Sequence, residues 1–451
     1  MAGITNTYDP TSTAQALAES ATAARQSILT RQTTAASATE KALSSLSSAL
    51  GAFQNSLAAI TGANKTMAAN SAVFSDATIA SASATPSAAA GTYEFFVQQV
   101  ASAHKVSYSG LQDFGNQGSI TFSVDKASFT IDLTSRATWT TRDLAMAINT
   151  AADNTSLSAS VVTTGDGKSE LVLTSKLTGA ANKIKVVATG TDTGLAAALA
   201  AAPNELSKPL DAIVRVGSAS GTPITQSSNT FNVIDGVTMT LTKAQASGSA
   251  PVALTVAADT GKTIVNTQTF VDAYNKLKSA IDSLVSPGDP ASGGAPGAFA
   301  TDSGVRSLRD RLVTLLRGTD TTSLANFGII ANRQGTLSVD STRLQKALSS
   351  NPTGLDTLIG STATGSKSGI AGELDTYLAL WTNSANGQIG SRKDAVSKLQ
   401  LDLSKRQTVL DQQYDSAYTR YLAQFTQLQT IQSSMSYNTS LFDALFSSDK
   451  D

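Results

Sequence analysis

The side chains that most often perform catalysis are scarce in this sequence. Its 451 residues include one histidine, His104, and no cysteine, so thiol chemistry, disulfide scaffolds and Cys/His zinc sites are excluded or nearly so. A serine–histidine–carboxylate triad would have to use His104, and no Gly-x-Ser-x-Gly turn follows a strong strand. We therefore expect His104, just after a predicted strand, to be a surface or half-buried residue without a catalytic role.

Sites for phosphate and for metal ions are weakly supported. The Gly-rich loop of residues 288–294 lacks the Lys-Ser/Thr ending of a phosphate-binding loop. No loop spaces its acidic residues alternately, as calcium ligands require. Those at turn-like positions or in the tail are Asp153, Asp166, Asp192, Asp259, Asp449 and Asp451. We expect no enzymatic activity, no cofactor and no metal site.

The charge balance and the distribution of apolar residues argue against further classes of protein. The 33 basic and 34 acidic residues make up 15% of the chain and leave a net charge of −1, which offers no electrostatic attraction for nucleic acid. No apolar run approaches the roughly 18 residues of a membrane span, and the N-terminus has no cleavable signal peptide pattern. A neutral surface rich in Ser, Thr, Asn and Gln favours an extracellular or self-assembling protein.

A long helix is predicted near the N-terminus. From about Thr11 to Ile60 apolar residues recur at steps of three, four or seven, and Asp9 and Gly62 provide start and stop signals. About 50 helical residues would extend about 75 Å, which no globular core requires. The half nearer the N-terminus is alanine-rich, so we expect this helix to become ordered only against a partner. Its larger apolar residues, which we predict to lie at an interface, include Leu46, Phe53 and Leu57.

A second long helix is predicted from about Ser391 to Ser436, and it most simply pairs with the first. The residues predicted to line the pair, and to form an oligomer or filament interface, are Leu399, Leu403, Leu410, Tyr421, Phe425, Leu428 and Met435. The chain then ends in an apolar cluster on a polar tail, as docking segments do. This C-terminal docking cluster comprises Leu441, Phe442, Leu445 and Phe446.

The middle of the chain changes to a period of two. Residues 120–124 and 129–133 alternate apolar and polar side chains, which predicts a hairpin, and further strands are predicted up to residue 256. A turn is predicted at Gly165–Lys168 and one helix at Thr141–Ala151, with Thr140 and Asp143 placed to cap it. Helical periodicity returns near residue 270 and dominates to the end, apart from a short β pair around Gly328–Val339.

The sequence therefore predicts an α+β protein in which long paired terminal helices and a helical domain carry nested antiparallel β head domains. We predict a terminal leg of residues 1–39 and 418–451 and a helical bundle of residues 40–74 and 262–417. We further predict a β domain of residues 75–110 and 208–261 and an inserted β-rich head of residues 111–207.

Several stretches, in order, resemble the bacterial flagellar filament cap family, flagellar hook-associated protein 2. They are Gly91–Ala101, Leu144–Asn149 with Leu157–Val162 and Leu171–Asn182, Ser228–Thr230 with Val233–Leu241, Phe270–Leu277, and Phe425–Leu428 with Met435. The similarity runs from about residue 40 to the end. The first 30 residues depart from the family pattern, as a divergent or lateral-flagellar member would.

The resemblance implies a non-enzymatic, extracellular cap at the flagellar tip. Such caps form rings, often of five copies, retain exported flagellin, and promote its folding and polymerisation as the filament elongates. Expected partners are a second copy, flagellin, the hook–filament junction proteins, an export chaperone, and the type III export apparatus that secretes the chain without a cleaved signal. Some members also bind host mucin. Flagellin itself, a hook–filament junction protein and a surface adhesin are the alternatives.

Overall fold

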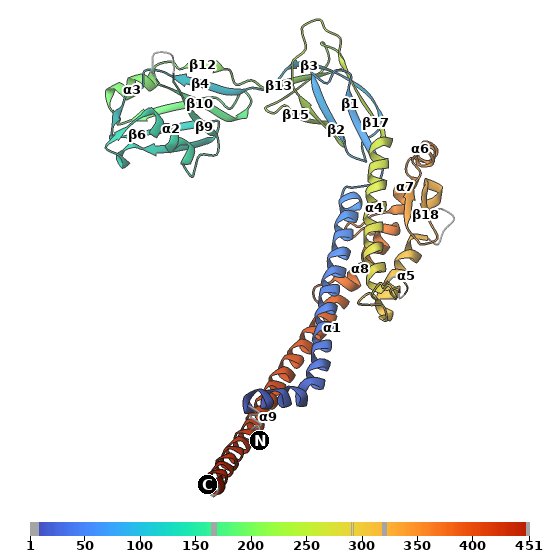
Figure 1. Cartoon of the computed structure of the whole chain (residues 1–451). Coiled ribbons are helices and arrows are strands. Elements are labelled where there is room, and N and C mark those ends of the chain that lie inside the picture. Colours follow the sequence, from blue (N-terminus) through green and yellow to red (C-terminus); the bar gives the residue numbers. More distant parts are fainter. Residues whose placement is uncertain (1–8, 164–168, 290, 292, 318–322, 448–451) are drawn as a thin grey trace. The chain divides into compact units, whose positions relative to one another are not determined.

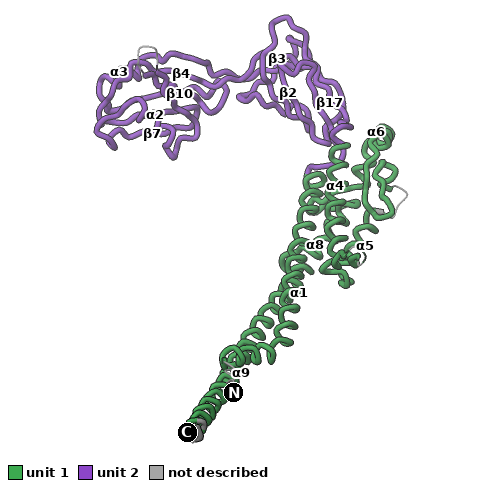
Figure 2. The backbone as a smooth tube through the Cα atoms, viewed as in Figure 1, with its two compact units in different colours: residues 1–63, 264–451 green, residues 64–263 purple. Residues whose placement is uncertain are grey.

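The computed structural model describes residues 9–163, 169–289, 291, 293–317 and 323–447. The chain forms two compact units, one built from residues 1–63 and 264–451 and the other from residues 64–263 (Figure 2). The first unit is mostly helical and the second mostly β, which confirms the predicted α+β class.

Two long helices form the backbone of the first unit. Helix α1 spans Pro10–Thr61 and helix α9 spans Gln388–Ser447, and the two run side by side (Figure 1). The predicted start signal is confirmed, because the Asp9 carboxylate accepts hydrogen bonds from the backbone N–H groups of Thr11 and Ser12 at 3.1 and 3.0 Å. Gly62 ends the helix, as predicted, with its N–H bonded to the Ala58 carbonyl.

Shorter elements complete the helical unit. They are α4 (Thr260–Val285), α5 (Ser303–Arg317), η2 (Leu324–Phe327), β18 (Ile329–Ala331), β19 (Leu337–Val339), α6 (Ser341–Ser350), α7 (Gly354–Ile359) and α8 (Gly369–Thr382). Phe53 of α1 and Phe270 of α4 are buried with ring centroids 6.5 Å apart. The β18–β19 hairpin confirms the predicted β pair, whereas the short helix α7 was not predicted.

The β unit contains two hydrophobic cores. The first lies between a five-stranded sheet in the order β1-β17-β3-β13-β14 and a three-stranded sheet in the order β15-β16-β2. These strands are β1 (Ala69–Phe74), β2 (Ala80–Ala84), β3 (Gly91–Gln99), β13 (Ala212–Val216), β14 (Pro223–Gln226), β15 (Thr230–Ile234), β16 (Val237–Leu241) and β17 (Val252–Asp259). Alternate residues of β16 and β17 are buried, as the period of two predicts.

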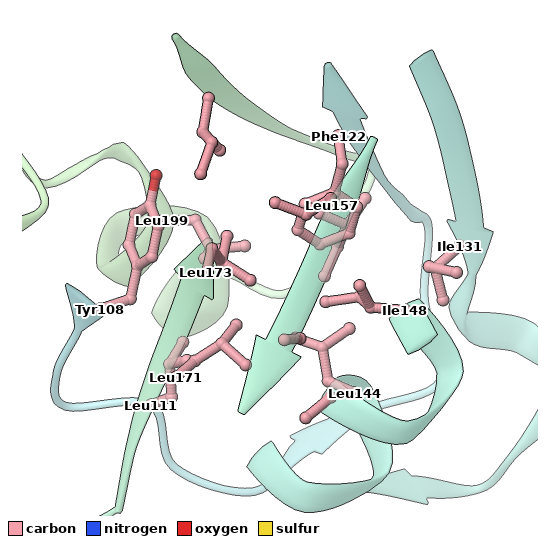
Figure 3. Close-up of a cluster of buried hydrophobic side chains, with 14 of the residues drawn as sticks. Tyr108, Leu111, Phe122, Ile131, Leu144, Ile148, Leu157, Leu171, Leu173 and Leu199 are labelled. Atoms are coloured by element: carbon pink, nitrogen blue, oxygen red, sulfur yellow. The ribbon is translucent and has the colours of Figure 1, made fainter. Parts of the chain in front are cut away.

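The second core packs helices and two sheets together. The sheets have the orders β12-β4-β10-β9 and β11-β6-β7, with a small β5-β8 pair beside them. The elements are β4 (Ala103–Tyr108), β5 (Phe114–Gly115), β6 (Ser119–Val124), β7 (Ala127–Asp132), η1 (Leu133–Ser135), β8 (Thr138–Trp139), α2 (Thr141–Thr150), β9 (Leu157–Thr163), β10 (Ser169–Thr178), β11 (Ile184–Thr189), α3 (Thr193–Ala200) and β12 (Asn204–Ser207). Figure 3 shows Leu144 and Ile148 of α2 among the leucines of β9 and β10.

Two local predictions in this core are confirmed. The predicted hairpin is formed by β6 and β7, with Phe122 opposite Phe129, and their stacked rings have centroids 5.3 Å apart. Helix α2 begins with a capping box in which Thr140 and Asp143 satisfy each other's backbone N–H groups.

Other predictions need correction. Leu133, expected in the hairpin, begins a 3-10 turn, because the Asp132 side chain caps the chain there. Strand β1 falls within the range predicted to be helical, and β4 belongs to the inserted head rather than to the β domain, because it pairs with β10 and β12. Helix α3 was missed in an alanine-rich run. The turn predicted at Gly165–Lys168 lies outside the described residues.

Candidate assembly surfaces

The two long helices meet through small and medium apolar residues. Leu29 and Ala36 of α1 form a buried cluster with Leu403 and Leu410 of α9. Near the start of α1, Ala14 and Ala18 are fully buried, which lets the backbones approach closely. The predicted pairing of the terminal helices is therefore confirmed, although the apolar cluster between them has only four buried residues among those described.

Polar side chains tie the same pair together. Gln26 and Gln407 donate to each other's side-chain carbonyl oxygens at 3.1 and 2.9 Å. Arg25 donates to the Gln413 Oε1 at 2.6 Å, and Gln400 donates to the Glu40 Oε2 at 2.8 Å. Two of these four hydrogen bonds are neutral amide contacts and two join an amide to one charged group, so none of them pairs opposite formal charges.

The predicted interface residues divide into four groups. Leu46, Phe53 and Leu57 lie in the interior of the helical unit. Leu403 and Leu410 lie in the α1–α9 cluster, and Tyr421 and Phe425 are half-buried. Leu399, Leu428 and Met435 are 46%, 42% and 64% exposed, so the sequence placed too many residues in the contact between the two helices.

Beyond residue 425, α9 presents its apolar residues to solvent. Every described side chain from residue 426 to 445 is exposed. Leu428, Ile431 and Met435 recur at steps of three and four and so share one helix face. The predicted docking residues Leu441, Phe442 and Leu445 are also exposed, and the side chain of Phe446 lies outside the described part of the chain. Such a series of exposed apolar residues is a common mark of an interaction site.

A groove of about 490 Å³ lies between α1 and α9. It is lined by apolar side chains that include Ile28 and Val409, and by the basic side chains of Arg25, Lys405 and Arg406. Arg406 is paired with Asp402 at 2.8 Å. The groove shows that the helical pair is incompletely packed along its length, so additional apolar surface is available beside the buried cluster.

His104, the residue that any triad would have required, is buried rather than exposed or half-buried. Its relative exposure is 2%, so the expectation from sequence is wrong on this point. The Nδ1 atom accepts a hydrogen bond from the backbone N–H of Ile184 at 2.8 Å, and Nε2 lies 3.3 Å from the Glu205 Oε1. Both ring nitrogens are thus engaged by the domain itself, which gives the ring a structural role.

Three asparagines in the family-like stretches have a role that the sequence did not reveal. Asn149 bonds both the C=O and the N–H of Ala159, at 2.7 and 2.9 Å. Asn229 does the same to Ala101 at 2.9 and 2.6 Å, and Asn275 to Leu337 at 2.8 and 2.9 Å. Each amide therefore satisfies both backbone groups of one residue, which lies 10, 128 and 62 positions away for Asn149, Asn229 and Asn275. An Asn inside a periodic element, where its propensity is poor, was the available signal.

The stretch Phe270–Leu277 is likewise structural. Phe270, Val271, Tyr274 and Leu277 are buried in the helical unit. Burial and, to a smaller degree, the Asp282 carboxylate raise the pKa of Tyr274 to about 12, so its hydroxyl stays neutral at any physiological pH.

The described residues offer neither a metal site nor a membrane span. Among them, no group of three or more His, Cys, Asp or Glu side chains could hold a metal ion. None of the helices described is both long and apolar enough to cross a bilayer.

Paired long helices with an exposed apolar extension, joined in one chain to β cores fixed by internal amide contacts, define a structural protein of an assembly. Family models agree with this class: flagellar hook-associated protein 2 C-terminus matches residues 211–437, its N-terminus matches residues 6–104, and the flagellin hook IN motif matches residues 119–177.

Individual relatives match most of the chain. A lateral flagellar hook-associated protein 2 of Vibrio parahaemolyticus is 34% identical over 83% of this chain and 85% of its own length. A B-type flagellar hook-associated protein 2 of Pseudomonas aeruginosa is 30% identical over 87% of this chain and 86% of its own. The crystal structure of the D1-D2-D3 domains of the Escherichia coli flagellar cap protein covers 79% of this chain and 99% of its own, with a TM-score of 0.59 and 26% identity. The chain therefore belongs to the flagellar hook-associated protein 2 family, the filament caps, and is a structural protein rather than an enzyme.

Proposed function

We propose that this protein works as an oligomeric cap at the distal tip of the flagellum, where it retains exported flagellin and promotes its folding and polymerisation. The observation that carries the proposal is the exposed apolar extension of α9 in a chain of the cap family. A helix with one apolar face is stabilised by packing that face against other helices. The end of a filament with helical subunits would supply such neighbours.

The helical pair suits a leg that enters the filament end. Its buried cluster is small and none of its cross-linking hydrogen bonds pairs opposite charges, so contacts with neighbouring helices would add much of the final stability. The groove lined by Ile28 and Val409 gives a neighbouring helix additional apolar surface. Leu399, Leu428 and Met435 would then become buried only in the assembly.

The proposed partners are those that membership of the cap family implies. Further copies of the chain would form a ring, flagellin would be held beneath it, and the hook–filament junction proteins would support the first cap. Leu441, Phe442 and Leu445 would dock first to an export chaperone and later to the filament. Export would proceed through the flagellar type III apparatus without a cleaved signal. A chain without cysteine has no disulfide to break before an unfolded passage.

Two α9 variants and one control variant test the leg. Leu428→Asp and Met435→Asp place a carboxylate on the apolar face, where burial of an unpaired charge costs several kcal/mol. Ser433→Asp adds the same charge about 200° around the helix from Met435, two residues away at 100° per residue. In a deletion strain, the first two variants should leave flagellin in the medium and few filaments by electron microscopy, and Ser433→Asp should restore filaments.

Location supplies the second measurement. Electron microscopy with a label on the wild-type protein should find it only at filament tips. Normal filaments in the deletion strain would overturn the cap role. Normal filaments with Leu428→Asp and Met435→Asp would overturn only the proposal that the apolar face of α9 packs in the filament. Purified chain that grows into long filaments would instead favour a flagellin. Binding of the purified protein to mucin, with no filament defect on deletion, would favour an adhesin.

A further inference from the structure

The single histidine joins two sheets of the second β core. His104 lies on β4, in the sheet β12-β4-β10-β9, and its Nδ1 atom accepts the N–H of Ile184, the first residue of β11 in the sheet β11-β6-β7. On its other side, Nε2 faces the Glu205 carboxylate of β12. We propose that His104 is an acid-sensitive clasp: its neutral ring holds β11 against β4, and protonation of the ring releases that contact.

The hydrogen-bond pattern requires one particular form of the ring. A backbone N–H can only donate, so Nδ1 must carry a free lone pair, and the proton of the neutral imidazole must lie on Nε2, where it is donated to Glu205. A second proton would have to occupy Nδ1. Two N–H donors would then point at each other across 2.8 Å, and the contact with Ile184 could not persist.

The groups around the ring shape its titration. Burial lowers the pKa of His104 most strongly, the hydrogen bond and charge of Glu205 oppose that shift, and the Lys183 ammonium adds to the lowering. Strand β10 contributes Lys176, whose Nζ atom donates away from the ring to the Asn154 carbonyl. On β4 itself, Lys105 is exposed, and burial raises the pKa of Tyr108, which stays neutral.

The direction of the pH dependence follows from that lowered pKa. When the clasp opens, the ring returns to an ordinary pKa of about 6.5, so the open form binds a proton at a higher pH than the closed form. The contact is therefore fully stable above about pH 6.5. Below that value it weakens by up to about tenfold per pH unit, until the pKa of the closed form is passed.

The structural consequence is local. Ile184 pairs with Val124 of β6 and its side chain is buried in the second core, so loss of its bond to His104 loosens the end of β11 first. The first β core and the helical unit contain no histidine, because the sequence has only this one. Acidification through this pH range should therefore act on the inserted head and leave the helical unit unchanged.

The full-length protein offers a direct test because the chain has one histidine. NMR would follow the single imidazole Cε1–H resonance and the hydrogen-exchange protection of the Ile184 amide between pH 8 and 5. The resonance should titrate below pH 6.5, and Ile184 protection should fall through the same range. Constant protection of Ile184 while the ring titrates would overturn the clasp.

Three variants separate the clasp from a general effect of acid. Glu205→Gln keeps an acceptor for Nε2 but removes the charge, so the midpoint of the imidazole titration and the midpoint of the loss of Ile184 protection should both move to lower pH. Glu94→Gln removes an exposed charge on β3 and should move neither midpoint. His104→Asn keeps an acceptor near the position of Nδ1 and cannot titrate, so Ile184 protection should lose its pH dependence. If His104→Asn does not fold, the shift of the Ile184 midpoint in Glu205→Gln decides, and unchanged midpoints there would overturn the proposal.

Discussion

The α1–α9 pair and the second β core show two different ways of holding a chain together. The helices bury a small cluster, mostly leucine and alanine, and add reciprocal amide contacts such as Gln26 with Gln407. The second β core buries phenylalanine, tryptophan and many branched side chains between two sheets and two helices. Figure 3 shows Phe122 among several of its leucines. The difference is that the second β core buries its large aromatic side chains, whereas α9 leaves Leu428, Ile431 and Met435 exposed to solvent.

The largest expected effect comes from a substitution in the second β core. Phe122 is fully buried and stacked on Phe129, so Phe122→Ala removes a large side chain and leaves a cavity that the two sheets cannot close. We expect a loss of about 3–5 kcal/mol in the free energy of unfolding. Urea unfolding followed by the fluorescence of Trp139, in a Trp381→Phe background, measures it. The matched change Val187→Ala, at an exposed position of the same domain, should cost under about 0.5 kcal/mol.

These two regions also differ in how well the sequence predicted them. Helix α1, the hairpin of β6 and β7, and the capping box of α2 follow local rules of period and capping, which need no knowledge of distant partners. Strand β4 and strand β1 were misassigned because their pairing partners lie far away in the sequence. Helix α3 was missed because its alanine-rich run lacks a clear apolar face.

The assembly surfaces were predictable only in part. A period of three and four identifies an apolar face but not its partner, so Leu403 and Met435 looked equivalent although one is buried and the other is exposed. The buried position of His104 depends on Ile184 and Glu205, which lie 80 and 101 residues away. The amide contacts of Asn229 and Asn275 reach 128 and 62 residues along the chain, so the poor propensity of an Asn can mark such a position but cannot name its partner.

Within the helical pair, a buried and an exposed leucine of α9 should contribute differently to stability. Leu403 is buried between α1 and α9, so Leu403→Ala should lower the free energy of unfolding of the helical unit by about 2–3 kcal/mol. Leu399 lies one turn away and is 46% exposed, so Leu399→Ala should change it by less than about 0.5 kcal/mol. Urea titrations followed by circular dichroism at 222 nm compare the two. Equal losses would mean that the isolated pair already uses its exposed face.

The smallest expected effect concerns the amide pair. Gln26→Ala removes two part-buried hydrogen bonds with Gln407 and an exposed one to the Thr30 hydroxyl. The Gln407 amide keeps its bond to the Asp411 carboxylate at 2.8 Å, so no buried donor is left unsatisfied. The loss should therefore be only about 0.5–1 kcal/mol by the same helix titration. Gln424→Ala, at an exposed site of α9, supplies the control and should be neutral. A loss above about 2 kcal/mol for Gln26→Ala would mean that polar contacts, rather than the leucine cluster, hold the pair, because neutral exposed hydrogen bonds do not reach that value. The apolar extension of α9 would then be a separate docking element rather than a continuation of the same packing.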